Sequence, residues 1–280
     1  MGDTAAVGNL SVDTAVNGGD GQYSARLCPD WEIWGPNGGY VASVALRAAA
    51  AHAVFERPAA FSCHYLSVAQ FGEVDLAVRT LRRTRRAESV AVSMTQAGKP
   101  ILEALGWFVD STDGLHHDHA TMPSVAHHES LTEISDLLPP DAPSTFPFWS
   151  NFEAKPLVFY ADPAQRPLGD PVIQNWYRFR PQATFEDPVV DACRSVILLD
   201  TMSWPAAVRA HPPDLAWMAP SLDVSVQFHR ADQKAEWLLA DGFAPVAEDG
   251  LIGYRSQVFS DGGALLASGS GQLLCRRVTP

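Results

Sequence analysis

Seven side chains that could bind a metal ion or transfer protons are concentrated in one segment of this 280-residue sequence. They are His116, His117, Asp118, His119, His127, His128 and Glu129. A zinc protease of the common type needs two histidines four residues apart on a helix with a glutamate between them, and the spacing here is different. Prolines flank the segment, which favours an irregular backbone and a poorly preformed site. We therefore interpret it as a solvated linker and predict no metal site.

Asp200 is a second candidate for acid–base chemistry. It follows the apolar run 195–199, which we expect to be a strand, and precedes residues 201–209, which we expect to be a helix. An aspartate at a helix start commonly caps the helix by accepting bonds from backbone N–H groups. The same carboxylate could act as a general base on a bound water. From the residues alone, the cap is the favoured interpretation.

Nucleophilic catalysis has little support in the sequence. A serine hydrolase of the α/β class needs Gly-x-Ser-x-Gly at a turn from a strand into a helix. The nearest match, residues 269–271, lacks both the full motif and a following helix. The cysteines Cys28, Cys63, Cys193 and Cys275 are scattered, without a CxxC pair. Neither a disulfide framework nor a cysteine zinc site is indicated.

Composition restricts the partners of the protein. Twenty Lys and Arg stand against 32 Asp and Glu, so the formal net charge is −12 and the pI is near 5.1. This balance argues against nucleic acid or an anionic membrane surface as the main partner. No stretch approaches the ~20 apolar residues of a membrane helix. The N-terminal residues lack the basic start and apolar core of a signal peptide, so we expect a cytoplasmic protein.

Residues 22–110 favour one helix followed by strands. A glycine turn at 35–39 leads into residues 40–50, an Ala- and Leu-rich run without Gly or Pro that is typical of a buried helix. Segments rich in Val, Phe, Leu and Thr come next and are typical of antiparallel strands. These strand segments are 61–68, 73–81, 89–96 and 101–109. A helix followed by a run of strands indicates the α+β class.

The second half of the chain repeats this order. Pairing Asn37 with Asp200 gives an offset of 163 residues, and pairing Leu102 with Leu266 gives 164. A nearly constant offset indicates two copies of one unit in tandem, and two unrelated α+β domains are the alternative. We divide the chain into a flexible leader (1–21), a first unit (22–110), a linker (111–171) and a second unit (172–280).

An ordered set of short motifs resembles the bacterial acyl-CoA thioesterase II family and its thioesterase-like relatives. In the first half the motifs are WGPNGGYVA at 34–42, TLR at 80–82, QAGKPI at 96–101 and the His-containing, Met-Pro-ending segment 114–123. In the second half they are SLD at 221–223, FHR at 228–230, EWLL at 236–239 and LAS at 266–268. The resemblance implies a double hot-dog fold, in which each of two repeats wraps a long helix in an antiparallel sheet.

The same resemblance implies hydrolysis of fatty acyl-CoA by a water molecule, without a covalent acyl-enzyme. Asp200, Ser221 and Gln272 match the Asp, Ser or Thr, and Gln that orient this water in the family. One extra residue separates Ser268 from Gln272 relative to the family pattern, and a bulge at Gly269 or Gly271 would restore the register. A non-catalytic protein that binds acyl-CoA or an acyl carrier on the same fold is the alternative.

Further residues would bind the substrate if the resemblance holds. Gly38 and Gly39 would allow an acyl carbonyl to approach the backbone, although tight helix packing explains them equally well. Trp34 and Trp204 adjoin the two expected helix starts and could form the wall of an acyl channel. Arg85 and Arg86, from the one basic run, could bind the phosphates of CoA, although a solvated hairpin is their default role. We expect no cofactor, and a homodimer or higher homo-oligomer.

Overall fold

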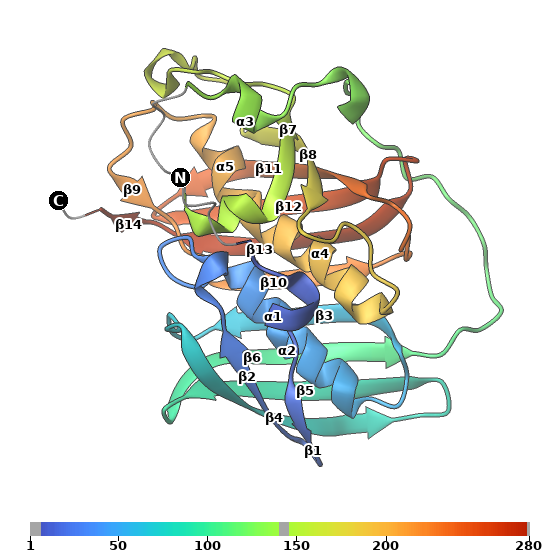
Figure 1. Ribbon diagram of the computed structural model, residues 1–280. Helices are drawn as coiled ribbons and strands as arrows, with labels where there is room; N and C mark the ends of the chain where they lie inside the picture. Colours follow the sequence, from blue (N-terminus) through green and yellow to red (C-terminus); the bar gives the residue numbers. More distant parts are fainter. Residues whose placement is uncertain (1–6, 140–145, 279–280) are drawn as a thin grey trace.

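The computed structural model describes residues 7–139 and 146–278 and is dominated by one antiparallel sheet (Figure 1). The twelve strands lie in the order β1-β2-β4-β5-β6-β3-β10-β13-β12-β11-β8-β7. The first six belong to the N-terminal half of the chain and the last six to the C-terminal half. From β2 to β8 the order reads the same from both ends of the sheet, as a tandem repeat requires.

The first half consists of one long helix and the strands that curve around it. Its elements are β2 (Gln22–Leu27), α2 (Gly38–His52), β3 (Arg57–Tyr65), β4 (Gly72–Arg83), β5 (Ala87–Gln96) and β6 (Lys99–Val109). Helix α2 begins after the cap residue Asn37, whose Oδ1 accepts the Tyr40 N–H at 3.0 Å. Most of α2 is buried, because Ala and Val dominate it and the other half of the protein covers the side that faces away from the sheet.

The second half repeats this arrangement. Its elements are β8 (Val172–Phe179), α4 (Pro188–Thr201), α5 (Ser203–Val208), β10 (Asp223–Phe228), β11 (Trp237–Glu248), β12 (Leu251–Ser260) and β13 (Leu265–Leu274). The two halves join where β3 pairs with β10, for example Cys63 with Val224 and Phe61 with Val226. Helices α2 and α4 pack against each other inside the curve of the sheet (Figure 1). The predicted α+β double hot-dog arrangement is confirmed.

The position of the second long helix corrects the sequence analysis. Residues 195–199, expected as a strand, lie inside α4, and Asp200 is near the end of this helix instead of at its start. The error has a physical cause: α4 is buried on all sides, so its apolar run shows no helical period. The true start carries the signal that was missed, since Asp187 accepts N–H bonds from the first turn and Pro188 occupies the first helical position.

The repeat offset changes at this point of the fold. Helices α2 and α4 begin 150 residues apart, whereas β5 and β12 begin 164 apart. The second copy therefore contains an insertion between α4 and β10, and this insertion includes α5 and β9 (Trp217–Met218). The counterpart of Asn37 is accordingly the cap residue Asp187, and the counterpart of Asp200 is Ala50.

The leader and the linker contain more structure than their composition indicated. Residues 7–21 include α1 (Leu10–Asp13) and β1 (Asn17–Gly19), which pairs with β2. Leu10 is buried, so this part of the leader is not loose; residues 1–6 lie outside the described residues. Between β6 and β8 lie η2 (His128–Ser130), α3 (Ile134–Leu137), η3 (Pro147–Asn151), β7 (Phe152–Pro156) and η4 (Pro163–Gln165). The C-terminal strand β14 (Arg276–Arg277) pairs with β9.

Gly39 allows the two central helices to touch. A Cβ at this position would lie 2.7 Å from the Cα of Ile197 and 3.1 Å from two carbonyl oxygens of α4. Backbone atoms cannot move aside as a flexible side chain can, so any other residue would push the helices apart. The close approach also brings the start of α2 to the end of α4.

We expect Gly39→Ala to lower the free energy of unfolding by about 1–3 kcal/mol, the usual cost of adding atoms to a packed interior. Gly253→Ala in β12 is the matched control, because a Cβ there meets nothing within 4 Å. Thermal or urea unfolding of both variants measures the difference. Equal stability of the two variants would contradict this account of helix packing.

Candidate active site

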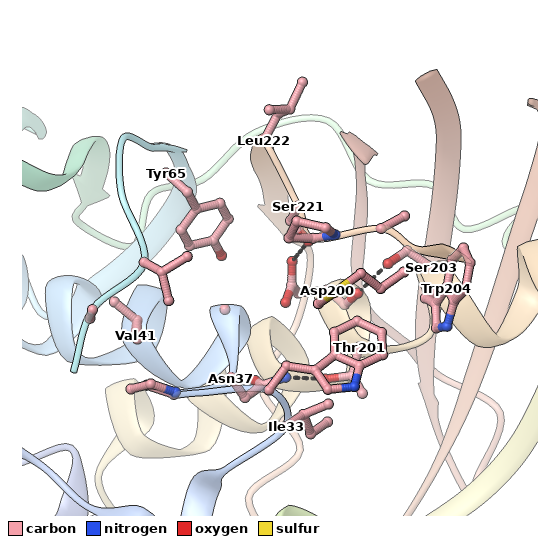
Figure 2. A pocket seen from close by; sticks show the side chains of 18 of the residues that line it. Ile33, Asn37, Val41, Tyr65, Asp200, Thr201, Ser203, Trp204, Ser221 and Leu222 are labelled. Carbon is pink, nitrogen blue, oxygen red and sulfur yellow. Dashed lines mark hydrogen bonds between the residues drawn. The ribbon is translucent and has the colours of Figure 1, made fainter. Parts of the chain in front are cut away.

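Asp200 places a carboxylate from the end of α4 at the first turn of α2. Its Oδ2 accepts the backbone N–H of Gly39 at 2.8 Å. Its Oδ1 accepts the hydroxyl of Ser221 at 2.7 Å (Figure 2). Asp200 is 5% exposed. The structure thus brings together two of the three side chains expected to act on a water molecule, one from each end of the inserted segment.

The surroundings of Asp200 oppose its ionisation. Burial raises its pKa to about 6 from an ordinary value of 3.8, and the nearby charge of Asp223 adds to the rise. The bonds from Ser221 and Gly39 act in the opposite direction, because they stabilise the charged form. The positive end of α2 also favours an anion at this position. A carboxylate with a pKa near 6 can take up and release a proton close to neutral pH.

Asn37 connects the two helices beside this carboxylate. Its Oδ1 caps α2 by accepting the Tyr40 N–H, and its Nδ2 donates to Thr201 Oγ1 at 3.2 Å. On the other side, Ser203 donates its hydroxyl to the backbone carbonyl of Asp200. Hydrogen bonds therefore fix the backbone of Asp200, its carboxylate and the side chain of the next residue, Thr201. Its side chain has little freedom to leave the first turn of α2.

The carboxylate opens into a largely apolar cavity of about 430 Å³. Trp34 and Trp204 both line it, with ring centroids 6.4 Å apart, and Phe146 packs on the edge of Trp34. Trp204 is the second residue of α5, so the insertion in the second repeat contributes a wall of the cavity. Trp34 has a φ of 58°, which is unusual for a bulky residue and indicates backbone strain at the cavity wall. Both tryptophans thus lie where the sequence analysis expected them.

The two glycines at the start of α2 have different neighbours. Gly39 faces the backbone of α4, as described above, whereas Gly38 lines the cavity. A Cβ on Gly38 would lie 2.8 Å from Asp200 Oδ2 and 3.3 Å from Tyr65 Oη. A side chain at Gly38 would therefore crowd the carboxylate and the phenol, and glycine keeps this part of the cavity open.

Gln272 does not reach the cavity. The residue before it, Gly271, faces inward, since a Cβ there would lie 2.8 Å from Tyr254 Oη. Side chains alternate along a strand, so Gln272 projects from the opposite face of β13, where it is exposed. The pairing of β12 with β13 is regular over 267–274, so the structure has no bulge at 269 or 271 that would turn Gln272 inward.

Arg85 and Arg86 also lie far from Asp200. They belong to the hairpin between β4 and β5, and this hairpin lies at the C-terminal end of α2, where Glu88 Oε2 accepts the Val54 N–H. Asp200 contacts the N-terminal end of the same 15-residue helix. The length of the helix, about 20 Å, separates the two places. The basic residue that lines the cavity is Arg276 in β14.

Several cavity residues had no signal in the sequence. Tyr65 ends β3, Thr201 ends α4 and Arg276 lies near the C-terminus, each in a segment without a recognisable motif. Tyr65 and Arg276 are far from Asp200 in the sequence, and the pairings of β3 with β10 and of β14 with β9 bring them to the cavity. The histidine cluster, by contrast, lies elsewhere: His128 stacks on Trp237 with centroids 4.9 Å apart.

Within residues 7–139 and 146–278, no three His, Cys, Asp or Glu side chains are grouped as metal ligands would be. In the same part of the chain, no helix has the length and apolar character needed to cross a membrane.

Comparison with known proteins gives a family for this fold and cavity. Residues 27–109 match the family model described as the acyl-CoA thioesterase N-terminal domain, and residues 128–274 match the acyl-CoA thioesterase C-terminal domain. The chain belongs to the acyl-CoA thioesterase family. The resemblance predicted from the sequence is thereby confirmed, and the boundary between the two family domains falls in the segment that joins β6 to the second half of the sheet.

Solved structures support the fold of this thioesterase-family chain. One is a conserved protein of unknown function with a hot-dog fold from Alicyclobacillus acidocaldarius (TM-score 0.78, covering 97% of this chain and 98% of that chain). Another is a protein from Thermobifida fusca YX provisionally assigned as a thioesterase II (0.80, 97% and 98%). A third is the acyl-CoA thioesterase II TesB2 from Mycobacterium marinum (0.76, 96% and 98%). Each is 18% identical to this chain, so the likeness concerns the fold.

The raised pKa of Asp200 predicts how stability depends on pH. Between pH 3.8 and about 6 the folded thioesterase-family chain holds a proton that the unfolded chain has lost. Ionisation of Asp200 therefore destabilises the fold as the pH rises through this window. Asp200→Asn has no such proton, so we expect its melting temperature minus that of the wild type to increase from pH 4 to pH 7. Thermal melts of both proteins across this pH range test the prediction. A difference in melting temperature that does not change with pH would contradict a raised pKa of Asp200.

Proposed function

We propose that the protein hydrolyses acyl-CoA thioesters with a water molecule activated by Asp200. One observation supports this proposal above the others: a buried carboxylate with a pKa near 6 opens into an apolar cavity at the start of a helix. A capping aspartate would need no such cavity. Membership of the acyl-CoA thioesterase family supports acyl-CoA as the substrate class.

The proposed reaction needs one base and no covalent intermediate. The Asp200 carboxylate takes a proton from water as the water oxygen attacks the thioester carbonyl carbon. The C–S bond then breaks, the CoA sulfur receives the proton from Asp200, and the free carboxylic acid and CoA leave. A thiolate is a good leaving group, so a positioned water and a polarised carbonyl are enough. Ser221 keeps the carboxylate oriented through its bond to Oδ1.

The start of α2 would stabilise the negative charge that develops on the carbonyl oxygen. The Gly39 and Tyr40 N–H groups already donate to Asp200 Oδ2 and Asn37 Oδ1. Within the described residues the Gly38 N–H is therefore the donor of this turn left for the substrate. Gly38 has no side chain to block this approach, and it lines the cavity. Fixed donors of this kind contribute most where water is excluded.

The rest of the cavity suits an acyl chain and a CoA phosphate at different places. Trp34, Trp204 and Phe146 provide an apolar wall for the acyl chain. Arg276 supplies a positive charge at the cavity, and guanidinium groups bind phosphates well. The sequence-based assignment of CoA phosphates to Arg85 and Arg86 is therefore replaced by an assignment to Arg276.

A non-catalytic acyl-CoA-binding protein remains the second candidate function. The observation that favours it is the outward position of Gln272. The resemblance implied that its amide helps to orient the water, and here that amide lies outside the cavity. This alternative predicts tight binding of acyl-CoA without release of the thiol.

We expect Asp200→Asn to lower kcat for acyl-CoA hydrolysis by about 10²–10⁴, the usual contribution of a general base. For the wild type, kcat/KM should rise about tenfold per pH unit below pH 6 and level off above it, because Asp200 must be ionised. Ser221→Ala should cost less, since Asp200 keeps its Gly39 bond. The measurement is release of CoA thiol across acyl chain lengths and pH values.

Gln272→Ala is the matched control for these variants, and we expect unchanged kcat because the side chain is exposed outside the cavity. Equal hydrolysis by the wild type and Asp200→Asn would overturn the catalytic role of Asp200. Binding without hydrolysis at every chain length would favour the second candidate function.

We expect Arg276→Ala to raise KM for acyl-CoA with little change in kcat, which is the behaviour of a group that binds substrate and transition state equally. Arg85→Ala with Arg86→Ala is the control and should leave both constants near wild type. The opposite pattern, with KM raised only by the control, would return the phosphate site to the β4–β5 hairpin.

A further inference from the structure

Two phenols near Asp200 have buried hydroxyls without a bonding partner. Tyr65 Oη and Tyr254 Oη are both shielded from solvent, and neither makes a hydrogen bond of normal geometry with the residues that the structure describes; beside Tyr65 lies the thiol of Cys63, a weak partner. A buried hydroxyl without a partner is costly, and native proteins rarely tolerate it. Two in one place point to a ligand atom that one of them binds.

Only one of these phenols lines the cavity. Tyr65 is a cavity residue, and its hydroxyl points into the same space as the Asp200 carboxylate (Figure 2). Gly38 lies between these two groups, since a Cβ on it would be 2.8 Å from Asp200 Oδ2 and 3.3 Å from Tyr65 Oη. A thioester bound in the cavity beside Gly38 would therefore meet both the base and the phenol.

Tyr254 occupies a different position. Its hydroxyl lies against Gly271, the inward-facing residue of β13, and its ring packs with Ala206, Ala207 and Leu273. It fills the space that a side chain at 271 would need. Tyr254 is therefore equally buried and near the same carboxylate, but it does not line the cavity.

The phenol of Tyr65 is a donor at neutral pH. Burial raises its pKa well above 10.0, and the negative charge of Asp200 raises it further. A protonated phenol has one O–H to give, and among the described residues it makes no bond to Asp200, whose oxygens accept from Gly39 and Ser221. The O–H is thus available to an acceptor on the substrate.

We propose that Tyr65 is a catalytic residue whose phenol donates a hydrogen bond to the thioester carbonyl oxygen. This inference rests on the proposed function and adds a donor to it. The carbonyl carbon lies next to the water held by Asp200, and the carbonyl oxygen lies against Tyr65 Oη. Tyr65 keeps its proton throughout; the proton that moves is the one that Asp200 takes from water and gives to sulfur. The bond strengthens as the oxygen gains negative charge in the transition state.

The first test compares Tyr65→Phe with Tyr254→Phe. Each change removes one buried, unpartnered hydroxyl beside Asp200 and keeps the ring, so neither breaks a bond within the protein and both should melt no lower than the wild type. We expect Tyr65→Phe to lower kcat by about 10²–10³, the cost of one oxyanion donor. KM should change little, and kcat/KM should still rise with pH up to about 6, because Asp200 is unchanged. Tyr254→Phe should keep kcat near wild type.

A second test does not depend on turnover. It uses two unreactive CoA analogues of equal chain length: a ketone, in which a methylene group replaces the thioester sulfur, and a thioether, in which a methylene group replaces the carbonyl. Tyr65→Phe should bind the ketone about tenfold more weakly than the wild type, as expected for one lost hydrogen bond. Both proteins should bind the thioether equally, because it has no carbonyl. Calorimetric titration gives the four dissociation constants.

The outcomes separate the two proposals. If wild type hydrolyses acyl-CoA but Tyr65→Phe keeps its kcat and its affinity for the ketone, Tyr65 is not the carbonyl donor and the proposed function stands. If wild type hydrolyses nothing but Tyr65→Phe loses affinity for the ketone alone, Tyr65 binds the carbonyl and the hydrolase proposal fails. Equal losses in Tyr65→Phe and Tyr254→Phe would overturn the assignment to Tyr65.

Discussion

The carboxylate of Asp200 is buried between the end of α4 and the first turn of α2, where Gly39 and Ser221 donate to it. A buried charge is expensive unless fixed donors replace its water, and these two donors come from opposite halves of the protein. The contact therefore requires that α2 and α4 pack side by side at backbone distance, with the start of α2 against the end of α4. Gly39 permits this approach, and the pairing of β3 with β10 keeps the two halves aligned.

The two repeats have the same scaffold but only one of them carries the acid. The structural counterpart of Asp200 in the first repeat is Ala50, and the caps of the two helices are Asn37 and Asp187. At the other end of the helix pair, Arg47 and Asp187 form an ion pair 2.6 Å apart. The duplicated fold thus offers two related helix junctions. One contains a carboxylate at a cavity, and the other is closed by a salt bridge.

The insertion between α4 and β10 makes the difference between these junctions. It adds α5, which supplies Trp204 to the cavity wall, and it leads to Ser221, which orients Asp200. The resulting apolar enclosure raises the pKa of Asp200 to about 6. The donors around the carboxylate prevent a still larger rise, so the group titrates near neutral pH. The cavity wall, the raised pKa of Asp200 and the orientation of its carboxylate therefore all depend on this inserted segment.

The sequence by itself determined the fold class, the tandem repeat and the pairing of Asp200 with Ser221. Strand periodicity, the Asn37 cap and the ordered family motifs each involve residues close together in the sequence, so they can be recognised without the structure. The tertiary structure decided the rest. A helix buried on all sides has no apolar face, so α4 could not be told from a strand by periodicity. A shift of one residue turns a strand side chain to the opposite face, and only the observed pairing shows that Gly271 faces inward and Gln272 outward. Tyr65 and Arg276 lie far from Asp200 along the chain at positions without a motif, and they reach the cavity only because the sheet and the C-terminal strand fold around it.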